Sequence, residues 1–167
     1  TPLPPGGRRR RVGGRLKRPS FQFYPADWLQ DLNLRQSSEA ARGVWIDLLC
    51  SMHQSEEYGV LRIPLQDIAR MLRTDIRLLR QLADKSVLSG KDLGAKSFVH
   101  VPAHAGIKGQ PVTLLLAPEG PMWYSKRLVR DEWLRSVRGA STRFTKPLTM
   151  PPTMPRQGER QGDSPSH

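Results

Sequence analysis

The sequence predicts a mainly helical α+β fold, and three observations support that prediction. Apolar residues recur at helical spacing in one long segment around Trp45 and in two short segments between residues 64 and 89. Residues 97–101 alternate between polar and apolar side chains, and residues 112–117, VTLLLA, have the length and composition of a second strand. The 167 residues are enough for one domain with a hydrophobic core.

The composition favours a polyanionic partner. The chain carries 27 Lys and Arg against 15 Asp and Glu, a formal charge of +12, and nucleic acid is the commonest partner of such proteins. No apolar run approaches the roughly 18 residues of a membrane-spanning helix, and no secretory signal follows the basic start. The single cysteine, Cys50, lies among Leu48, Leu49 and Met52, which predicts a buried structural thiol.

Both ends of the chain are predicted to be disordered. Residues 1–19 hold seven basic residues, no acid, and many prolines and glycines, so they cannot bury enough apolar surface to offset the entropy of ordering. They are either a basic arm that binds phosphates without reading sequence or a solvated leader upstream of the true start. The arm's candidate phosphate contacts are consecutive: Arg8, Arg9, Arg10 and Arg11. Residues 145–167 form a Pro/Gly/Ser/Gln-rich tail, which leaves 20–144 as the folded domain.

The folded domain is predicted to begin with an aromatic-rich segment. Residues 21–24 have the composition of a short strand, and Pro25 opens a turn of helix that carries Asp27 and Asp31 outward. Because no basic residue is interleaved with the aromatic side chains, they are expected in the core and not in a platform for stacking bases.

The strongest helix prediction covers residues 37–54. Ser37 or Ser38 can cap the helix, Glu39 lies in its first turn, and a wide apolar stripe includes Trp45. His53 at its end is expected to be a packing or capping residue. A short alternating strand follows at 59–63.

Residues 64–89 are predicted to form two helices, about 65–72 and 76–87, joined by a tight turn. Apolar residues that include Leu79 and Leu82 form the buried face of the second helix, and cations occupy its free face. This arrangement is typical of a helix-turn-helix, although a pair of ordinary surface helices is the alternative. The predicted DNA contacts are polar and face outward: Arg73, Arg77, Arg80, Gln81 and Lys85. Asp84 can pair with Arg80, so Arg77 is the better candidate for a base contact.

The next elements are a predicted hairpin and a last helix. Residues 90–96 are expected to be a polar loop, and the two predicted strands flank a glycine-rich turn at 104–110 that carries Lys108. The order of helix, short strand, two helices and hairpin is that of a winged helix, in which the hairpin is the wing. A helix of about 123–137 then carries Lys126, Arg127 and Arg130, which form either a phosphate-contacting surface or a solvated helix face.

No catalytic or metal-binding motif is present in the sequence. It contains no GxxxxGK[ST] loop and no GxGxxG after a strand, and His100 and His104 have no cysteine or carboxylate at metal-ligand spacing. The only cysteine has no evident base partner. The expectation is a protein without enzymatic activity and without a cofactor or a metal.

The run FYPADWLQDLNL followed by ARGVWIDLLCSMHQ resembles the N-terminal domain of phage and prophage replication proteins. The matching residues are Tyr24, Asp27, Trp28, Leu29 and Asp31, then Gly43, Trp45, Leu48 and Leu49. The resemblance covers about 21–144 and implies a winged-helix domain in a replication initiator or helicase-loading factor. The chain lacks the large C-terminal domain of an initiator.

These observations lead to a functional hypothesis with two alternatives. The hypothesis is a winged-helix protein that binds duplex DNA for replication in the cytoplasm of a bacterial cell, at the nucleoid. The alternatives are a transcriptional regulator, or a module that binds a replisome protein without reading DNA. No membrane partner is expected.

Overall fold

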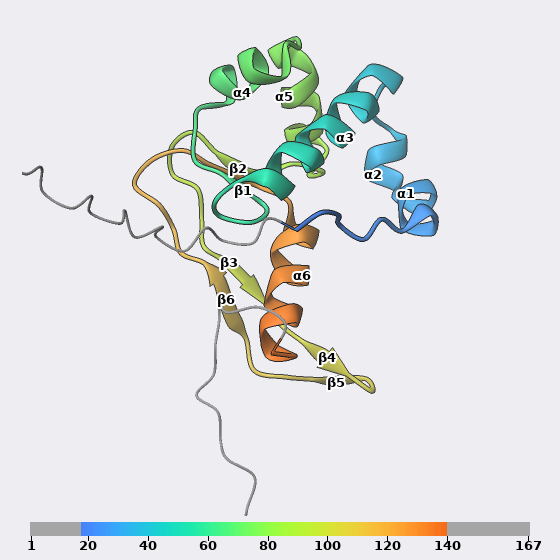
Figure 1. Ribbon diagram of the computed structural model, residues 1–167, viewed down its shortest axis with the longest axis vertical. Helices are drawn as coiled ribbons and strands as arrows, with labels where there is room; N and C mark the ends of the chain where they lie inside the picture. Colours follow the sequence, from blue (N-terminus) through green and yellow to red (C-terminus); the bar gives the residue numbers. More distant parts are fainter. Residues whose placement is uncertain (1–17, 140–167) are drawn as a thin grey trace, which may run out of the picture.

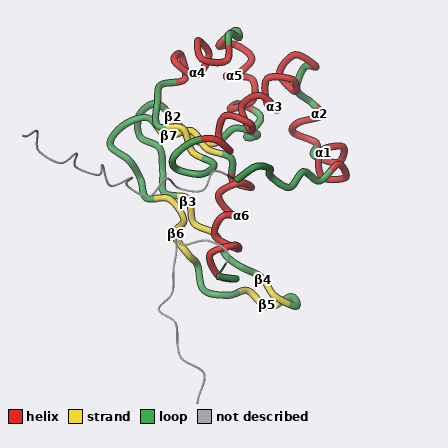
Figure 2. The backbone as a smooth tube through the Cα atoms, in the orientation of Figure 1, coloured by secondary structure: helices red, strands yellow, loops and turns green. Residues whose placement is uncertain are grey.

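The computed structural model describes residues 18–139, a mixture of helices and small antiparallel sheets (Figures 1 and 2). The predicted phosphate contacts Arg8, Arg9, Arg10 and Arg11, the tail from 145 and the last residues of the predicted domain, 140–144, lie outside the described part. Within residues 18–139, no helix is long and apolar enough to cross a membrane.

Helix α3, Glu39–Gln54, forms where the sequence predicts the strongest helix. The Ser38 Oγ atom accepts a hydrogen bond from the Ala41 amide at 3.1 Å and caps the helix, as Ser residues at this position often do. The buried stripe includes Trp45, whose exposed fraction is 8%. Cys50 lies outside this stripe and is exposed, so the prediction of a buried thiol is wrong.

The predicted helix pair is present as α4, Leu65–Leu72, and α5, Ile76–Asp84. Arg73 ends α4 in the left-handed conformation at φ 53°, and the Asp75 side chain caps α5 by accepting from the Arg77 amide at 2.8 Å. Leu79 and Leu82 are fully buried and hold α5 against α3. Helix α5 ends earlier than predicted because the backbone turns away just after it, where Ser86 has a positive φ of 59°.

A three-stranded antiparallel sheet joins parts of the chain that are far apart in sequence. Its strands are β1, Val60–Leu61, β2, Ser89–Lys91, and β7, Met122–Tyr124, in the order β1-β7-β2. The predictions of a polar loop from residue 90 and of Trp123 inside a helix are therefore wrong. Gly90 lies opposite Trp123, and a Cβ atom on Gly90 would be 1.9 Å from the Met122 carbonyl oxygen. Only glycine permits this pairing.

Between β2 and β7 the chain forms a long arm, which extends to the end of the molecule farthest from α4 (Figure 1). Strands β3, Phe98–His100, and β6, Val112–Leu115, pair antiparallel, which confirms the predicted hairpin. The expected turn at its tip contains a further pair of short strands, β4, Ala103–His104, and β5, Ile107–Lys108. Ala105 and Gly106 make the reversal between them with positive φ values.

The aromatic N-terminal segment crosses the end of α6, Lys126–Val137. Residues 21–24 are irregular and not a strand, because they pair with no other backbone segment. They lead into two short helices, α1, Pro25–Gln30, and α2, Leu32–Arg35. The Asp31 side chain caps α2 by accepting from the Leu34 amide at 3.1 Å, and the Ser125 side chain caps α6.

Two apolar clusters stabilise the described fold. The larger lies among α3, α4 and α5 and includes Trp45 and Trp123, and the smaller joins the sheet to the arm and α6 through Met122 and Val129. The C-terminal part of α6 packs less closely, because the side chains of Leu134 and Val137 are 39% and 58% exposed. The sheet and α6 thus link the helical part of the molecule to the arm.

Arg18, which was expected in the disordered leader, is anchored in the fold. Its guanidinium pairs with the buried carboxylate of Glu132 on α6 and lies 4.1 Å from the ring centre of Tyr58. Its carbonyl oxygen accepts from Nε2 of His53 at 2.9 Å, and Nδ1 of His53 is 3.0 Å from the Tyr58 hydroxyl. Because a carbonyl only accepts, Nε2 carries the His53 proton and Nδ1 accepts from Tyr58.

Candidate nucleic-acid interface

Helix α5 presents a row of arginines on the side opposite its buried leucines. Arg73, Arg77 and Arg80 are exposed, as the sequence predicts. Arg77 forms a two-pronged ion pair with Asp75, with Nη2 and Nε at 2.6 and 2.9 Å from the same carboxylate oxygen. These hydrogen bonds, with the one from the Arg77 amide, hold the pKa of the Asp75 carboxyl below its ordinary value.

The ion pair reverses the predicted ranking of the two central arginines. Arg80 was expected to pair with Asp84, but no ion pair joins these two side chains in the described structure. Arg77 instead is held by Asp75, which caps the same helix. Arg80 is therefore the side chain of α5 that is more available to an external phosphate or base.

Two other predicted contacts on α5 lie away from this row. The Gln81 carbonyl oxygen accepts from the Ser38 hydroxyl at 2.8 Å, so it ties α5 to the start of α3. Lys85 is the half-buried residue that ends α5. Neither side chain belongs to the exposed arginine surface formed by Arg73, Arg77 and Arg80.

The structure separates Lys108 from the arginines of α5. Lys108 is exposed at the tip of the arm in β5, and Figure 1 places the β4–β5 tip at one end of the molecule and α4–α5 at the other. The sequence predicted that α5 and Lys108 contact the same stretch of duplex. In the structure they do not lie on one continuous surface.

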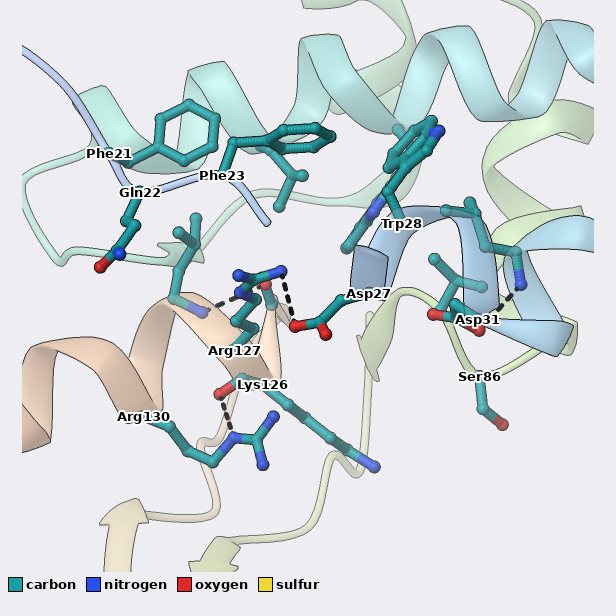
Figure 3. Close-up of a pocket in the computed structure, with 16 residues that line it drawn as sticks. Phe21, Gln22, Phe23, Asp27, Trp28, Asp31, Ser86, Lys126, Arg127 and Arg130 are labelled. Atoms are coloured by element: carbon teal, nitrogen blue, oxygen red, sulfur yellow. Dashed lines mark hydrogen bonds and ion pairs between the residues drawn. The ribbon is translucent and has the colours of Figure 1, made fainter. Parts of the chain in front are cut away.

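Helix α6 brings its cations to the aromatic N-terminal segment. Arg127 extends from α6 toward Asp27 and the segment that carries Phe23 and Trp28, while Lys126 and Arg130 line the same hollow on the side away from these rings (Figure 3). The Arg127 guanidinium lies 4.1 Å from the centre of the Tyr24 ring, a cation–π contact. The prediction that these aromatic residues lie in the core is wrong for Phe23 and Tyr24, whose rings are exposed. The contact of Tyr24 with Arg127 joins segments about 100 residues apart and leaves no local pattern in the sequence.

Arg127 is half-buried and incompletely satisfied. Its Nη1 atom is 3.7 Å from Asp27 and its Nε atom 3.9 Å from Asp131, which are ion pairs too long for hydrogen bonds. Its Nη2 atom is buried and has no hydrogen-bond partner within the described structure. The sequence predicted that Arg127 belongs to a phosphate-contacting surface, with a solvated helix face as the alternative. The side chain is half-buried and lines a groove.

This groove, which we call the α1–α6 groove, consists of two adjoining hollows of about 210 and 300 Å³. Both are lined by Asp27, Arg127 and Arg130, so they are continuous. The first reaches Trp28 and Lys126, and the second reaches Tyr24 and His100 of the arm. Lys126 and Arg130 are exposed at its rim, and neither makes an ion pair in the described structure.

Burial shifts the pKa values of two side chains that line the second hollow. Burial raises the pKa of the Asp131 carboxyl, although Arg127, Arg130 and Arg18 oppose that shift. Burial and the nearby Arg130 charge lower the pKa of His100, whose ring meets the edge of Trp133 at 5.4 Å between centres. Burial in the groove therefore makes the ionised form of Asp131 less favourable than that of an exposed carboxyl group.

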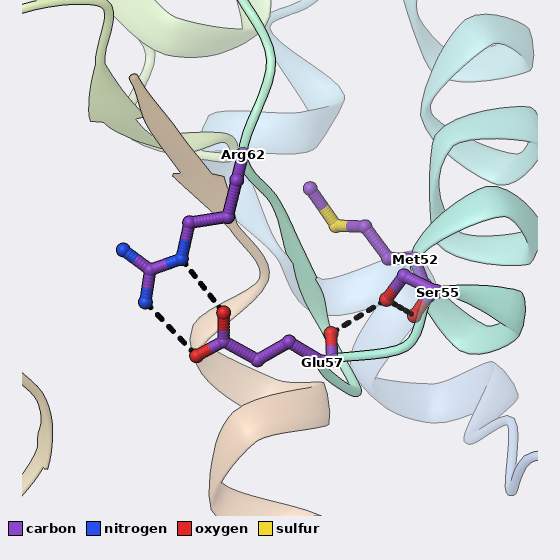
Figure 4. Close-up of polar contacts among 4 residues, drawn as sticks. All are labelled: Met52, Ser55, Glu57 and Arg62. Carbon is purple, nitrogen blue, oxygen red and sulfur yellow. Dashed lines mark hydrogen bonds and ion pairs between the residues drawn. The ribbon is translucent and has the colours of Figure 1, made fainter. Parts of the chain in front are cut away.

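A second exposed ion pair, similar to the Asp75–Arg77 pair on α5, lies just after the C-terminal end of α3. Arg62 donates from Nε and Nη2 to the two oxygens of Glu57 at 2.7 and 3.0 Å (Figure 4). The same turn places the Ser55 hydroxyl 2.7 Å from the Met52 carbonyl oxygen at the end of α3. The Glu57–Arg62 pair belongs to this turn and lies outside both cationic surfaces.

No group of three or more His, Cys, Asp or Glu that could hold a metal ion occurs within residues 18–139. Comparison with protein-family models, with curated proteins and with solved structures found no match for this chain.

Proposed function

We propose that this chain is a winged-helix protein that binds duplex DNA through α5 and has no catalytic activity of its own. The order α3–β1–α4–α5–β2–β7, with the sheet order β1-β7-β2, supports the winged-helix assignment. In that architecture the second helix of the pair enters the major groove. The observation that carries the proposal is the row of exposed arginines on α5, opposite the buried Leu79 and Leu82.

The contacts on α5 divide by their surroundings. Within residues 18–139 Arg80 forms no ion pair, so it is the candidate for a two-pronged contact with a guanine edge. Arg73, in the turn before α5, is placed to contact a phosphate. Arg77 joins them when duplex phosphates compete with Asp75 for its guanidinium.

A replication role rests on the resemblance of the segments around Trp28 and Trp45 to phage and prophage replication proteins. In that role the protein would bind DNA at the nucleoid of a bacterial cell and position a replication partner there. A transcriptional regulator would use the same α5 contacts, so both roles share the test below.

The test is the affinity of a fluorescently labelled duplex for the parent chain and for two single variants. Arg80→Ala is expected to weaken binding of a preferred duplex by about 1–3 kcal/mol. Arg138→Ala, which removes the same charge from an exposed position at the end of α6, should change it little. Equal binding by all three folded proteins would contradict the proposal.

A further inference from the structure

We propose that the α1–α6 groove binds single-stranded nucleic acid, at a site separate from the duplex-binding surface of α5. Single-stranded sites combine cations that follow the phosphates with aromatic rings on which unpaired bases stack. The groove has both, with Lys126 and Arg130 on its α6 side and Phe23 and Tyr24 on the segment that precedes α1.

The aromatic side chains of the groove are available to a ligand. Phe23 and Tyr24 are 43% and 38% exposed, which is unusual for large rings in a segment that also supplies Phe21 and Trp28 to the core. The rings of Phe23 and Trp28 are tilted against each other with centres 5.7 Å apart, so Trp28 supports Phe23 from one side. A base that stacks on Phe23 would therefore meet a ring that is already held in place.

The cations of the groove lie on one face of α6, across the groove from Phe23 and Trp28 (Figure 3). Lys126 and Arg130 are four residues apart, which places them one helical turn from each other, and both are exposed without a carboxylate partner in the described structure. Arg130 is oriented by a hydrogen bond from its Nε atom to the Lys126 carbonyl oxygen at 3.3 Å. The two charges can follow successive phosphates of one strand.

The three acidic residues of the groove balance its three cations in formal charge, so binding of a phosphate depends on whether these acids are engaged or can be displaced. Asp31 is engaged as the cap of α2, and Asp131 is partly buried against Arg127. Asp27 is the exposed acid, with 69% of its side-chain surface accessible, and its 3.7 Å contact with Arg127 is long. A phosphate oxygen that replaces Asp27 could approach Nη1 of Arg127 more closely and form a charge-assisted hydrogen bond with it.

An intact duplex does not fit these features, because its bases are stacked on one another and present no free faces. Unpaired nucleotides, of DNA or of RNA, share the chemistry that the groove offers. The leader, residues 1–17, also carries cations, so the test needs a signal that arises in the groove itself.

The test measures oligothymidylate and oligouridylate binding to the full chain by fluorescence anisotropy and by tryptophan quenching. Trp28 and the buried Trp45 both line the groove, so a strand bound there should quench mainly the emission of Trp28, and Trp28→Phe should strongly reduce that quenching. The double variant Lys126→Ala with Arg130→Ala should weaken binding about tenfold and reduce the slope of log affinity against log salt by about 1.4. Asp27→Asn should strengthen binding.

The matched control is Lys96→Ala with Arg138→Ala, which removes two exposed cations that do not line the groove. Equal weakening by the two double variants, or quenching of the same size in Trp28→Phe as in the parent, would overturn the groove assignment. A preference for one oligonucleotide would distinguish DNA from RNA as the natural strand. The two assignments can fail separately. If the groove variants bound oligothymidylate as the parent does, the groove assignment would fail. If Arg80→Ala still weakened duplex binding, the α5 assignment would stand.

Discussion

At the scale of single residues, Arg18 explains how a buried carboxylate is tolerated. The Glu132 side chain is 3% exposed, and a lone charge in such a position would be strongly destabilising. Arg18 supplies the opposite charge, and the Tyr58 ring and the His53 side chain fix its position. The first described residue thereby connects α3 with α6.

Arg18→Ala should lower the free energy of unfolding by about 3–5 kcal/mol, because it leaves the Glu132 charge buried without its partner. Denaturant unfolding monitored by circular dichroism measures this change. The control is Arg18→Met combined with Glu132→Leu, which removes both charges and should cost less than the single variant. A single variant as stable as the parent would show that the pair does not hold the N-terminal segment.

The Asp131 carboxyl should make stability depend on pH. Because burial raises its pKa in the folded chain, the folded state binds a proton in a pH range in which the unfolded chain has already released it. The contribution of Asp131 to stability is therefore greatest below the ordinary pKa of 3.8 and falls as the pH rises through the raised value. The difference in melting temperature between the parent and Asp131→Asn should fall as the pH is raised across that range and then stay constant. A difference that grew with pH would contradict this assignment.

Single residues also mark what sequence could not predict. The arginines of α5 were identified from helical spacing, because a helix face is a local property. The contact of Arg127 with Tyr24 and the pair of Arg77 with Asp75 depend on three-dimensional placement and on rotamers, so they left no pattern in the sequence. Cys50 was misplaced because its apolar neighbours in sequence lie on another face of α3.

At the scale of elements, the pairing of β2 with β7 is the feature that the sequence predicts least well. It is also the feature with the strictest requirement for one residue type, glycine at position 90. Each of these strands has three residues, too few for a clear alternating pattern. Their pairing brings Gly90 against the backbone of Met122 and Trp123 at a φ of +117°, which only glycine adopts readily. Helices α3, α4 and α5 were predicted because their apolar stripes and caps are local signals.

Gly90→Ala should disrupt the sheet, because its Cβ atom would overlap the Met122 carbonyl oxygen. Gly94→Ala is the matched control, since Gly94 also has a positive φ, of +69°, but has open space around it. The control should cost about 1–2 kcal/mol for the left-handed conformation alone, and Gly90→Ala should cost clearly more. Thermal unfolding of the two variants measures the difference, and equal costs would place β2 away from β7.

At the scale of the whole molecule, positive charge is distributed over separate surfaces. Helix α5, which carries Arg77 and Arg80, lies at one end, and β5, which carries Lys108, lies at the tip of the arm at the other (Figure 1). The cations that line the α1–α6 groove belong to α6 and to neither of these elements. A duplex on α5 and a single strand in the groove would therefore use different cations. This arrangement suits a protein that binds DNA where the two strands have separated.

The measurement that tests duplex binding by α5 most directly is a gain of affinity, because loss of folding cannot produce one. Asp75→Asn keeps a good helix cap and removes the carboxylate that holds Arg77. Glu57→Gln releases Arg62 from a similar ion pair outside α5 and serves as the control. The salt dependence of duplex affinity should become steeper by about 0.9 in Asp75→Asn, the value for one added phosphate contact, with tighter binding at low salt. If Asp75→Asn and Glu57→Gln both bound the duplex with the affinity and salt slope of the parent, α5 would not be the duplex-binding surface.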